Sequence, residues 1–149
     1  MRNKVELLAP AGGERQFISA VENGADAVYV GGSLYNARIN AENFDKAQMQ
    51  SAIDYAHKRG VKVNVTMNTL VADDELAGAL DYAVFLYEAG ADALIIQDLG
   101  LGSVIRKASR IWNFIFRRRR ASATRIRFRS AGIWATKESC SQGSFRLKK

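Results

Sequence analysis

The sequence has 149 residues, 48% of them hydrophobic, which is enough for the packed core of one domain. Its single cysteine, Cys140, excludes an internal disulfide framework and a cysteine-clustered metal site within one chain. The formal net charge is +7, the apolar runs are far shorter than a membrane span, and the amino terminus lacks a secretory signal pattern, so we expect a cytoplasmic protein.

The amino-terminal part alternates between predicted strands and helices. Residues 5–9 form a first expected strand that stops at Pro10, and a helix is expected over residues 14–23. A second strand is expected over residues 27–30. The loop that follows, residues 33–44, is longer than most strand-to-helix connections, and long loops at this position often carry function.

The next helix has a clear start signal, because Asp45 is followed three residues later by Gln48 as in a capping box. Its predicted core stripe is Met49, Ala52, Ile53 and Ala56. Asp73 or Asp74 is expected to cap a third helix, with a core face made by Leu76, Leu80, Ala83, Val84 and Tyr87. A further strand is expected over residues 93–96, and a helix over residues 99–107.

The stretch over residues 61–68 alternates strictly between apolar and polar side chains. Val61, Val63, Val65 and Met67 would lie on one face, and Lys62, Asn64, Thr66 and Asn68 on the other. Strands of a parallel sheet that is covered on both faces are normally apolar throughout. The polar face therefore predicts a strand that looks into the wet interior of a barrel, with an edge strand that has a solvated face as the alternative.

An internal repeat supports this architecture. Residues 24–28 (Gly-Ala-Asp-Ala-Val) and 90–94 (Gly-Ala-Asp-Ala-Leu) share one pattern of helix stop, turn and strand start. Repeated strand–helix–strand units predict a parallel sheet. Four such units fill residues 1–103, whereas a full barrel needs about 250 residues. We therefore predict an α/β fold of the (β/α) TIM-barrel type, with only the first four βα units present.

Several motifs occur in the order and spacing of the collagenase-like peptidase family, which the chain resembles over residues 4–103. They are residues 6–12 (Glu-Leu-Leu-Ala-Pro-Ala-Gly), 24–32 (Gly-Ala-Asp-Ala-Val-Tyr-Val-Gly-Gly), 36–38 (Asn-Ala-Arg), 43–44 (Asn-Phe), 55–57 (Tyr-Ala-His), 68–70 (Asn-Thr-Leu) and 90–98 (Gly-Ala-Asp-Ala-Leu-Ile-Ile-Gln-Asp).

The resemblance implies an eightfold barrel of which this chain holds the first four strands. Some members of that family are named collagenases or proteases, and others act in the hydroxylation of ribosomal RNA, transfer RNA or quinone precursors. Some carry an iron–sulfur cluster on cysteines that lie later in the chain and have no counterpart here, so we expect no cofactor in this chain. We interpret it as a truncated member of the family that is inactive alone, with peptide or RNA as the substrate of its intact relatives.

Five residues are candidates for substrate binding and none is predicted to be catalytic. They are Glu6 at the end of the first strand, Arg38 in the long loop, Asn64 and Asn68 on the polar face, and Gln97 after the fourth strand. Glu6 and Arg38 have solvated surface charges as their alternative interpretation. His57 is interpreted as the complement of a helix dipole rather than a base. No metal-binding set can be assembled from the sequence.

The basic tail, residues 104–149, holds 14 Lys and Arg and a single acid, whereas residues 1–103 hold 8 Lys and Arg and 14 acids. Arginines interleaved with aromatic residues can bind RNA, which makes an RNA-binding module the alternative function. The other interpretation is an irregular, disordered tail produced by a frameshift, because periodicity and family resemblance end together. Open edges on an incomplete barrel also predict self-association.

Overall fold

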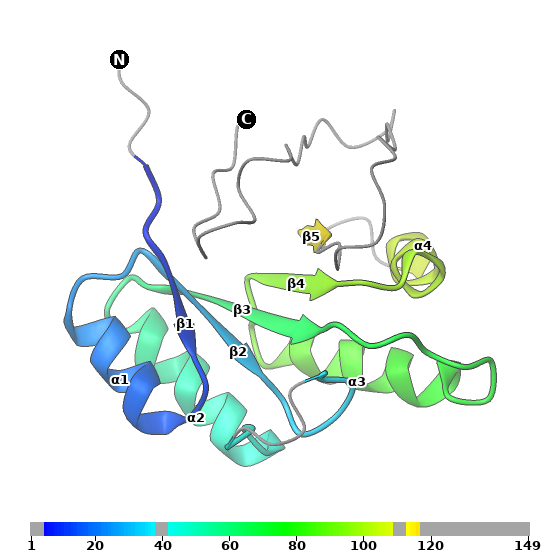
Figure 1. The fold of residues 1–149 in the computed structure, drawn as a ribbon, viewed down its shortest axis with the longest axis horizontal. Coiled ribbons are helices and arrows are strands. Elements are labelled where there is room, and N and C mark those ends of the chain that lie inside the picture. Colours follow the sequence, from blue (N-terminus) through cyan, green and yellow to red (C-terminus); the bar gives the residue numbers. More distant parts are fainter. Residues whose placement is uncertain (1–4, 38–41, 109–112, 117–149) are drawn as a thin grey trace.

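The computed structural model describes residues 5–37, 42–108 and 113–116, which form an alternating α/β unit (Figure 1). The elements in chain order are β1 (Leu8–Ala11), α1 (Glu14–Glu22), β2 (Ala27–Gly31), α2 (Lys46–His57), β3 (Lys62–Met67), α3 (Leu76–Glu88), β4 (Ala93–Ile96), α4 (Leu99–Ala108) and β5 (Phe114–Phe116). No helix within these ranges is long and apolar enough to cross a membrane.

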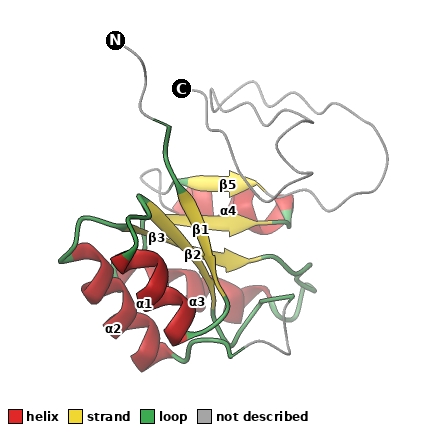
Figure 2. Cartoon of the chain, turned by 60° about the vertical axis from the view of Figure 1, so that its left-hand side comes forward, coloured by secondary structure: helices red, strands yellow, loops and turns green. Residues whose placement is uncertain are grey.

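The five strands form one parallel sheet in the order β1-β2-β3-β4-β5. Helices α1, α2 and α3 lie together on one face of that sheet (Figure 2). A doubly wound sheet reverses its strand order and carries helices on both faces, whereas a barrel adds each strand beside the last. The observed order therefore confirms a parallel α/β fold of the barrel-like kind.

The main core lies between the sheet and these helices. Val63, Val65 and Met67 of β3 are buried in one cluster with Met49 and Ile53 of α2, as the alternating pattern of β3 predicts. The intervening side chains point to the opposite face, because successive residues of a strand alternate. The side chains of Asn64 and Thr66 lie on that second face, which we call the inner face.

The first strand differs from the prediction. We expected residues 5–9, but β1 spans Leu8–Ala11 and contains Pro10. In the described part of the chain β1 is an edge strand that pairs only with β2, so a residue without a backbone N–H is tolerated there. The preceding Leu7 carbonyl still accepts hydrogen bonds from the backbone N–H groups of Asp26 and Ala27, at 3.0 and 3.1 Å.

Helices α2 and α3 contrast in how well their faces were predicted. The capping box of Asp45 and Gln48 is present, and the buried residues of α2 are the four that were predicted. Helix α3 instead begins after Glu75, without a side-chain cap from Asp73 or Asp74. Val84 and Tyr87 are 56% and 48% exposed, so that part of its predicted core face was wrong. The buried residues are Ala79, Tyr82, Ala83 and Leu86.

The regular structure continues past residue 103. Helix α4 runs to Ala108, and β5 pairs in parallel with β4, a fifth strand that we did not predict. Ile105 and Phe114 are both buried in the core, so this stretch packs with the rest of the fold. The irregular tail was therefore placed too early, and residues 117–149 of the predicted tail lie outside the described residues.

Candidate functional site

Polar side chains gather on the inner face near the carboxyl ends of β2 and β3. Asn64, Thr66 and Asn68 are 7%, 4% and 9% exposed, which is unusual burial for uncharged polar groups. The Thr66 hydroxyl donates to the Val30 carbonyl at 3.1 Å and lies 3.5 Å from Asn36 Oδ1. Buried polar side chains that are hydrogen-bonded to one another are held in fixed positions.

The loop between β2 and α2 folds onto this cluster. Asn68 Oδ1 accepts a hydrogen bond from the Ala37 backbone N–H at 2.9 Å. Asn36 Nδ2 donates to Asn43 Oδ1 at 2.7 Å, which joins the two ends of the loop. A side chain at Gly31 would place its Cβ only 2.0 Å from Asn36 Nδ2, so this glycine makes room for the asparagine.

Asp98 organises the end of β4. One carboxylate oxygen accepts from the backbone N–H groups of Gly100 and Leu101 at 2.7 and 3.1 Å, and the other accepts from Val71 N–H at 3.1 Å. Burial alone would raise the pKa of Asp98, but the three backbone hydrogen bonds outweigh it and lower the pKa below its usual value. Asp98 thus caps α4 and fastens the β3–α3 loop.

Three of the predicted site residues lie at the inner face or its carboxyl edge. Asn64 pairs in register with Tyr29 and Ala93, and Asn68 follows β3 directly. Gln97 is half-buried and follows β4, the neighbouring strand. Arg38 lies outside the described residues, so its predicted role stays a prediction.

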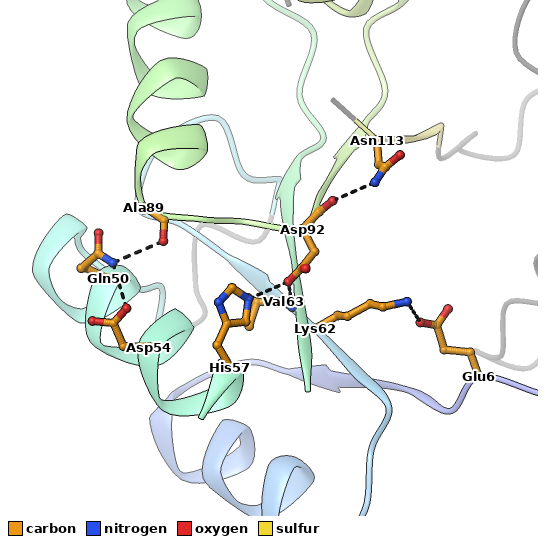
Figure 3. A network of polar contacts seen from close by, with 9 residues as sticks. All are labelled: Glu6, Gln50, Asp54, His57, Lys62, Val63, Ala89, Asp92 and Asn113. Carbon is orange, nitrogen blue, oxygen red and sulfur yellow. Dashed lines mark hydrogen bonds and ion pairs between the residues drawn. The ribbon is translucent and has the colours of Figure 1, made fainter. Parts of the chain in front are cut away.

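Glu6 lies at the opposite end of the sheet from its expected position. It precedes β1, and its Oε1 lies 3.0 Å from Nζ of Lys62, the first residue of β3 (Figure 3). The hydrogen bond and charge of Glu6 raise the pKa of Lys62. Glu6 is the second residue of the predicted strand and precedes the observed one, so it lies on the amino-terminal side in either case. In barrel enzymes that end serves stability rather than catalysis.

The single histidine also lies at the amino-terminal end. His57 Nε2 is 2.9 Å from Asp92 Oδ2, which also accepts the Val63 backbone N–H at 2.8 Å (Figure 3). The residues we describe contain no group of three or more His, Cys, Asp or Glu side chains placed to hold a metal ion. They also contain no cysteine, so they supply no thiolate for an iron–sulfur cluster.

Three of the site residues were not among the predicted ones. Asn36, Asn43 and Asp98 build the frame of the site. In the sequence, Asn36 and Asn43 stand within the family motifs, and Asp98 follows a predicted strand. The pairing of Asn36 with Asn43 depends on how the loop closes, which no local pattern encodes. The glycine at position 31 is a further usable signal, because a glycine in a strand often marks the close approach of another group.

The assembled groups suit recognition by hydrogen bonds. Amides such as those of Asn64 and Gln97 both donate and accept, while the hydroxyl of Thr66 adapts its direction. Within the described ranges, the histidine lies at the other end of the sheet, away from these groups. The described groups at this end of the sheet therefore offer hydrogen-bond donors and acceptors.

Comparison with known proteins agrees with this architecture. The sequence profile of Peptidase family U32 matches residues 12–113. The chain is 43% identical over 99 residues to a 23S rRNA 5-hydroxycytidine synthase of Escherichia coli, covering 66% of this chain and 15% of that protein. It is 39% identical over 95 residues to tRNA hydroxylation protein P1 of Bacillus subtilis, covering 64% of this chain and 22% of that protein.

A third relative is an uncharacterized protease of Methanocaldococcus jannaschii, 40% identical over 96 residues that cover 64% of this chain and 24% of the relative. Among solved structures, a type I 3-dehydroquinate dehydratase of Clostridium difficile superposes with a TM-score of 0.55 at 15% identity. That match covers 74% of this chain and 50% of the other, and at this identity it concerns the fold alone.

The chain thus spans only 15% to 24% of the length of these three curated relatives. The match of the profile nevertheless extends over most of the chain and ends at residue 113, next to β5. Because the profile covers more than half of the sequence and agrees with the expected motifs, the chain belongs to peptidase family U32.

Proposed function

We propose that this chain forms part of a U32 barrel whose inner face positions an RNA nucleotide for hydroxylation. The observation that carries the proposal is the set of uncharged hydrogen-bonding groups at the carboxyl ends of β2 and β3, namely Asn36, Thr66 and Asn68, beside Asn64. Amide side chains read the edges of unpaired bases through paired donors and acceptors. Two of the relatives carry names that refer to RNA hydroxylation.

Peptide cleavage has less support from these residues. One class of peptidase uses a metal-bound water, and the described residues contain no group of three or more His, Cys, Asp or Glu side chains placed to hold a metal ion. One relative is nonetheless called a protease, so peptide remains the competing ligand in the test below.

The chain alone is proposed to be inactive. It corresponds to less than a quarter of each of the three relatives, and its described residues hold no cysteine for the cluster that the family resemblance implies. Residues in the parts of an intact relative that this chain does not match would supply the remaining chemistry. We place this activity in the cytoplasm, where ribosomal and transfer RNA are found.

The proposal is tested by binding of a fluorescent single-stranded RNA oligonucleotide to the whole chain. Anisotropy is measured at a salt concentration of about 0.3 M or above, to suppress charge-driven binding to the tail. Loss of the amide in Asn64→Ala should weaken binding by about tenfold, the effect of one hydrogen bond of about 1.4 kcal/mol. Ser51→Ala, on the exposed face of α2, is the matched control and should bind like the unaltered chain.

An excess of an unlabelled, unstructured peptide should not displace the RNA. If the peptide displaces it, or if Asn64→Ala binds RNA as well as the control does, the inner face is not an RNA site.

A second candidate function rests on the tail. Its arginine-rich composition favours binding to RNA through phosphates, with an affinity that falls steeply as salt rises. Replacing the four arginines of residues 117–120 by glutamine should reduce the salt dependence of RNA binding if the tail is the binding element. An unchanged salt dependence would exclude that candidate.

The tail has a separate proposed origin as the product of a frameshift. The single acid in residues 104–149 and the end of the profile match at residue 113 support it. Translating the coding DNA in the other two frames from codon 100 onward should restore a strand–helix rhythm containing a Ser-Thr-Gln strand. If neither frame restores it, the basic tail is an evolved part of the protein.

A further inference from the structure

Tyr35, in the loop between β2 and α2, has an unusual backbone conformation. Its φ is +54°, and among the residues the structure describes it is the only non-glycine residue with a positive φ. A bulky side chain rarely adopts this left-handed region, because its Cβ crowds the backbone. Such a conformation persists only where the surrounding contacts hold it, and it is common in functional loops.

The contacts that hold Tyr35 come from α3 and the residue before it. The Tyr35 hydroxyl lies 3.5 Å from the Glu75 carbonyl oxygen, and its ring centroid lies 6.0 Å from that of Tyr82. Gly78, in the first turn of α3, makes room for the hydroxyl, since a Cβ there would lie only 2.8 Å from the Tyr35 oxygen.

The next two residues connect this loop to the candidate site. Asn36 fills the space left by Gly31 and reaches Thr66, while the Ala37 N–H donates to Asn68. Three consecutive residues are therefore anchored to three places, namely α3, the end of β2 and the end of β3. A displacement of Tyr35 would also pull on the groups that frame the inner face.

We infer that Tyr35 and Gly78 form a clamp that presets residues 35–37, at the start of the β2–α2 loop, over the carboxyl ends of β2 and β3. Both are positioning residues for the RNA site of the proposed function, on which this inference rests. A loop that is already ordered loses less conformational freedom when the ligand binds, so the clamp strengthens binding without touching RNA.

The test uses the whole chain and the three variants Gly78→Ala, Tyr35→Phe and their combination. Alanine favours a helix over glycine, so Gly78→Ala should unfold at the same temperature or higher. Its methyl group should nevertheless displace the Tyr35 hydroxyl and speed amide hydrogen exchange in residues 33–37 by about tenfold or more. RNA binding should weaken by about fivefold, through lost ordering of the loop.

The double variant provides the rescue. Tyr35→Phe removes the hydroxyl and so leaves space for the methyl group that Gly78→Ala adds. The combination should therefore return the exchange rate and the RNA affinity to those of Tyr35→Phe alone. Ser103→Ala, on the exposed side of α4, is the control for a change in helix propensity away from the loop.

The outcomes separate the clamp from the proposed function. Unchanged hydrogen exchange in Gly78→Ala would overturn the clamp, and faster exchange with unchanged RNA affinity would overturn its positioning role. Another outcome is that the unaltered chain does not bind RNA while hydrogen exchange is faster in Gly78→Ala and is restored in the double variant. In that case the proposed function fails and the clamp stands as a structural feature.

Discussion

Asp26 and Asp92 make the same reciprocal pair of hydrogen bonds in two different βα units. Asp26 Oδ2 accepts the Leu7 N–H at 2.9 Å, and the Asp26 N–H donates back to the Leu7 carbonyl at 3.0 Å. Asp92 does the same with Val63, at 2.8 and 2.9 Å. Each aspartate thus fastens the start of its own strand to the start of the preceding one, which explains the repeated Gly-Ala-Asp-Ala sequence.

This pairing gives a first prediction about stability. Asp92→Ala leaves the Val63 N–H without its side-chain acceptor and should lower the free energy of unfolding by about 1 to 3 kcal/mol, measured in urea. Asp92→Asn retains an acceptor oxygen and should lose less. Asp81→Ala, on the exposed face of α3, is the control. Equal losses for Asp92→Ala and the control would show that the pair does not contribute to stability.

The two faces of β3 give a second prediction. Val63 is fully buried against the helices, so Val63→Asp introduces an unpaired buried charge and should cost several kcal/mol, on the order of 3 or more. Asn64→Ala, one residue further on, removes a side chain from the inner face and should cost far less. Both are compared by urea denaturation followed by circular dichroism. A larger loss for Asn64→Ala than for Val63→Asp would contradict the assignment of the faces.

The lowered pKa of Asp98 gives a third prediction, about pH. A carboxyl whose pKa falls on folding adds stability at pH values above its unfolded pKa, near 3.8, and this contribution disappears as pH falls through the lower folded pKa. Asp98→Asn should therefore be less stable than the unaltered chain at pH 7, with the difference shrinking below pH 4. The measurement is the urea midpoint of both proteins from pH 7 to pH 3. A difference that stays constant over this range would rule out the carboxylate as its source.

The exposed strand edge gives a fourth prediction. In the described part of the chain β1 pairs only with β2, and unpaired edges recruit other chains. We expect the purified protein to dimerise or aggregate with increasing concentration in sedimentation experiments. A monomer at all concentrations that unfolds in one cooperative transition would contradict this expectation.

The features that sequence could predict depend on neighbouring residues. The capping box at Asp45 and Gln48 lies within four residues, and the alternation along β3 needs only the order of side chains. The repeated aspartates could also be recognised, although their hydrogen-bond partners could not. Features of this kind were confirmed because local backbone geometry decides them.

The features that were missed depend on the partner in space. The start of β1 is set by its register with β2, and the apolar run before Pro10 gives no sign of it. The amino-acid pattern of α3 is apolar on most sides, so several faces fit and the face with Val84 and Tyr87 was chosen wrongly. Strand β5 follows the basic carboxyl end of α4. Its position beside β4 is decided by tertiary packing, which no local sequence pattern reveals.

The sequential order of the strands has a consequence for how the chain folds as it is synthesised. Each new strand pairs with the one made just before it, so its partner has already left the ribosome when it emerges. Among the strands that the structure describes, each pairs with its predecessor in the chain, so each pairing closes a loop of one βα unit. A growing polypeptide of this design would gain order one βα unit at a time, with each intermediate exposing the edge of β1 and the edge of its most recent strand.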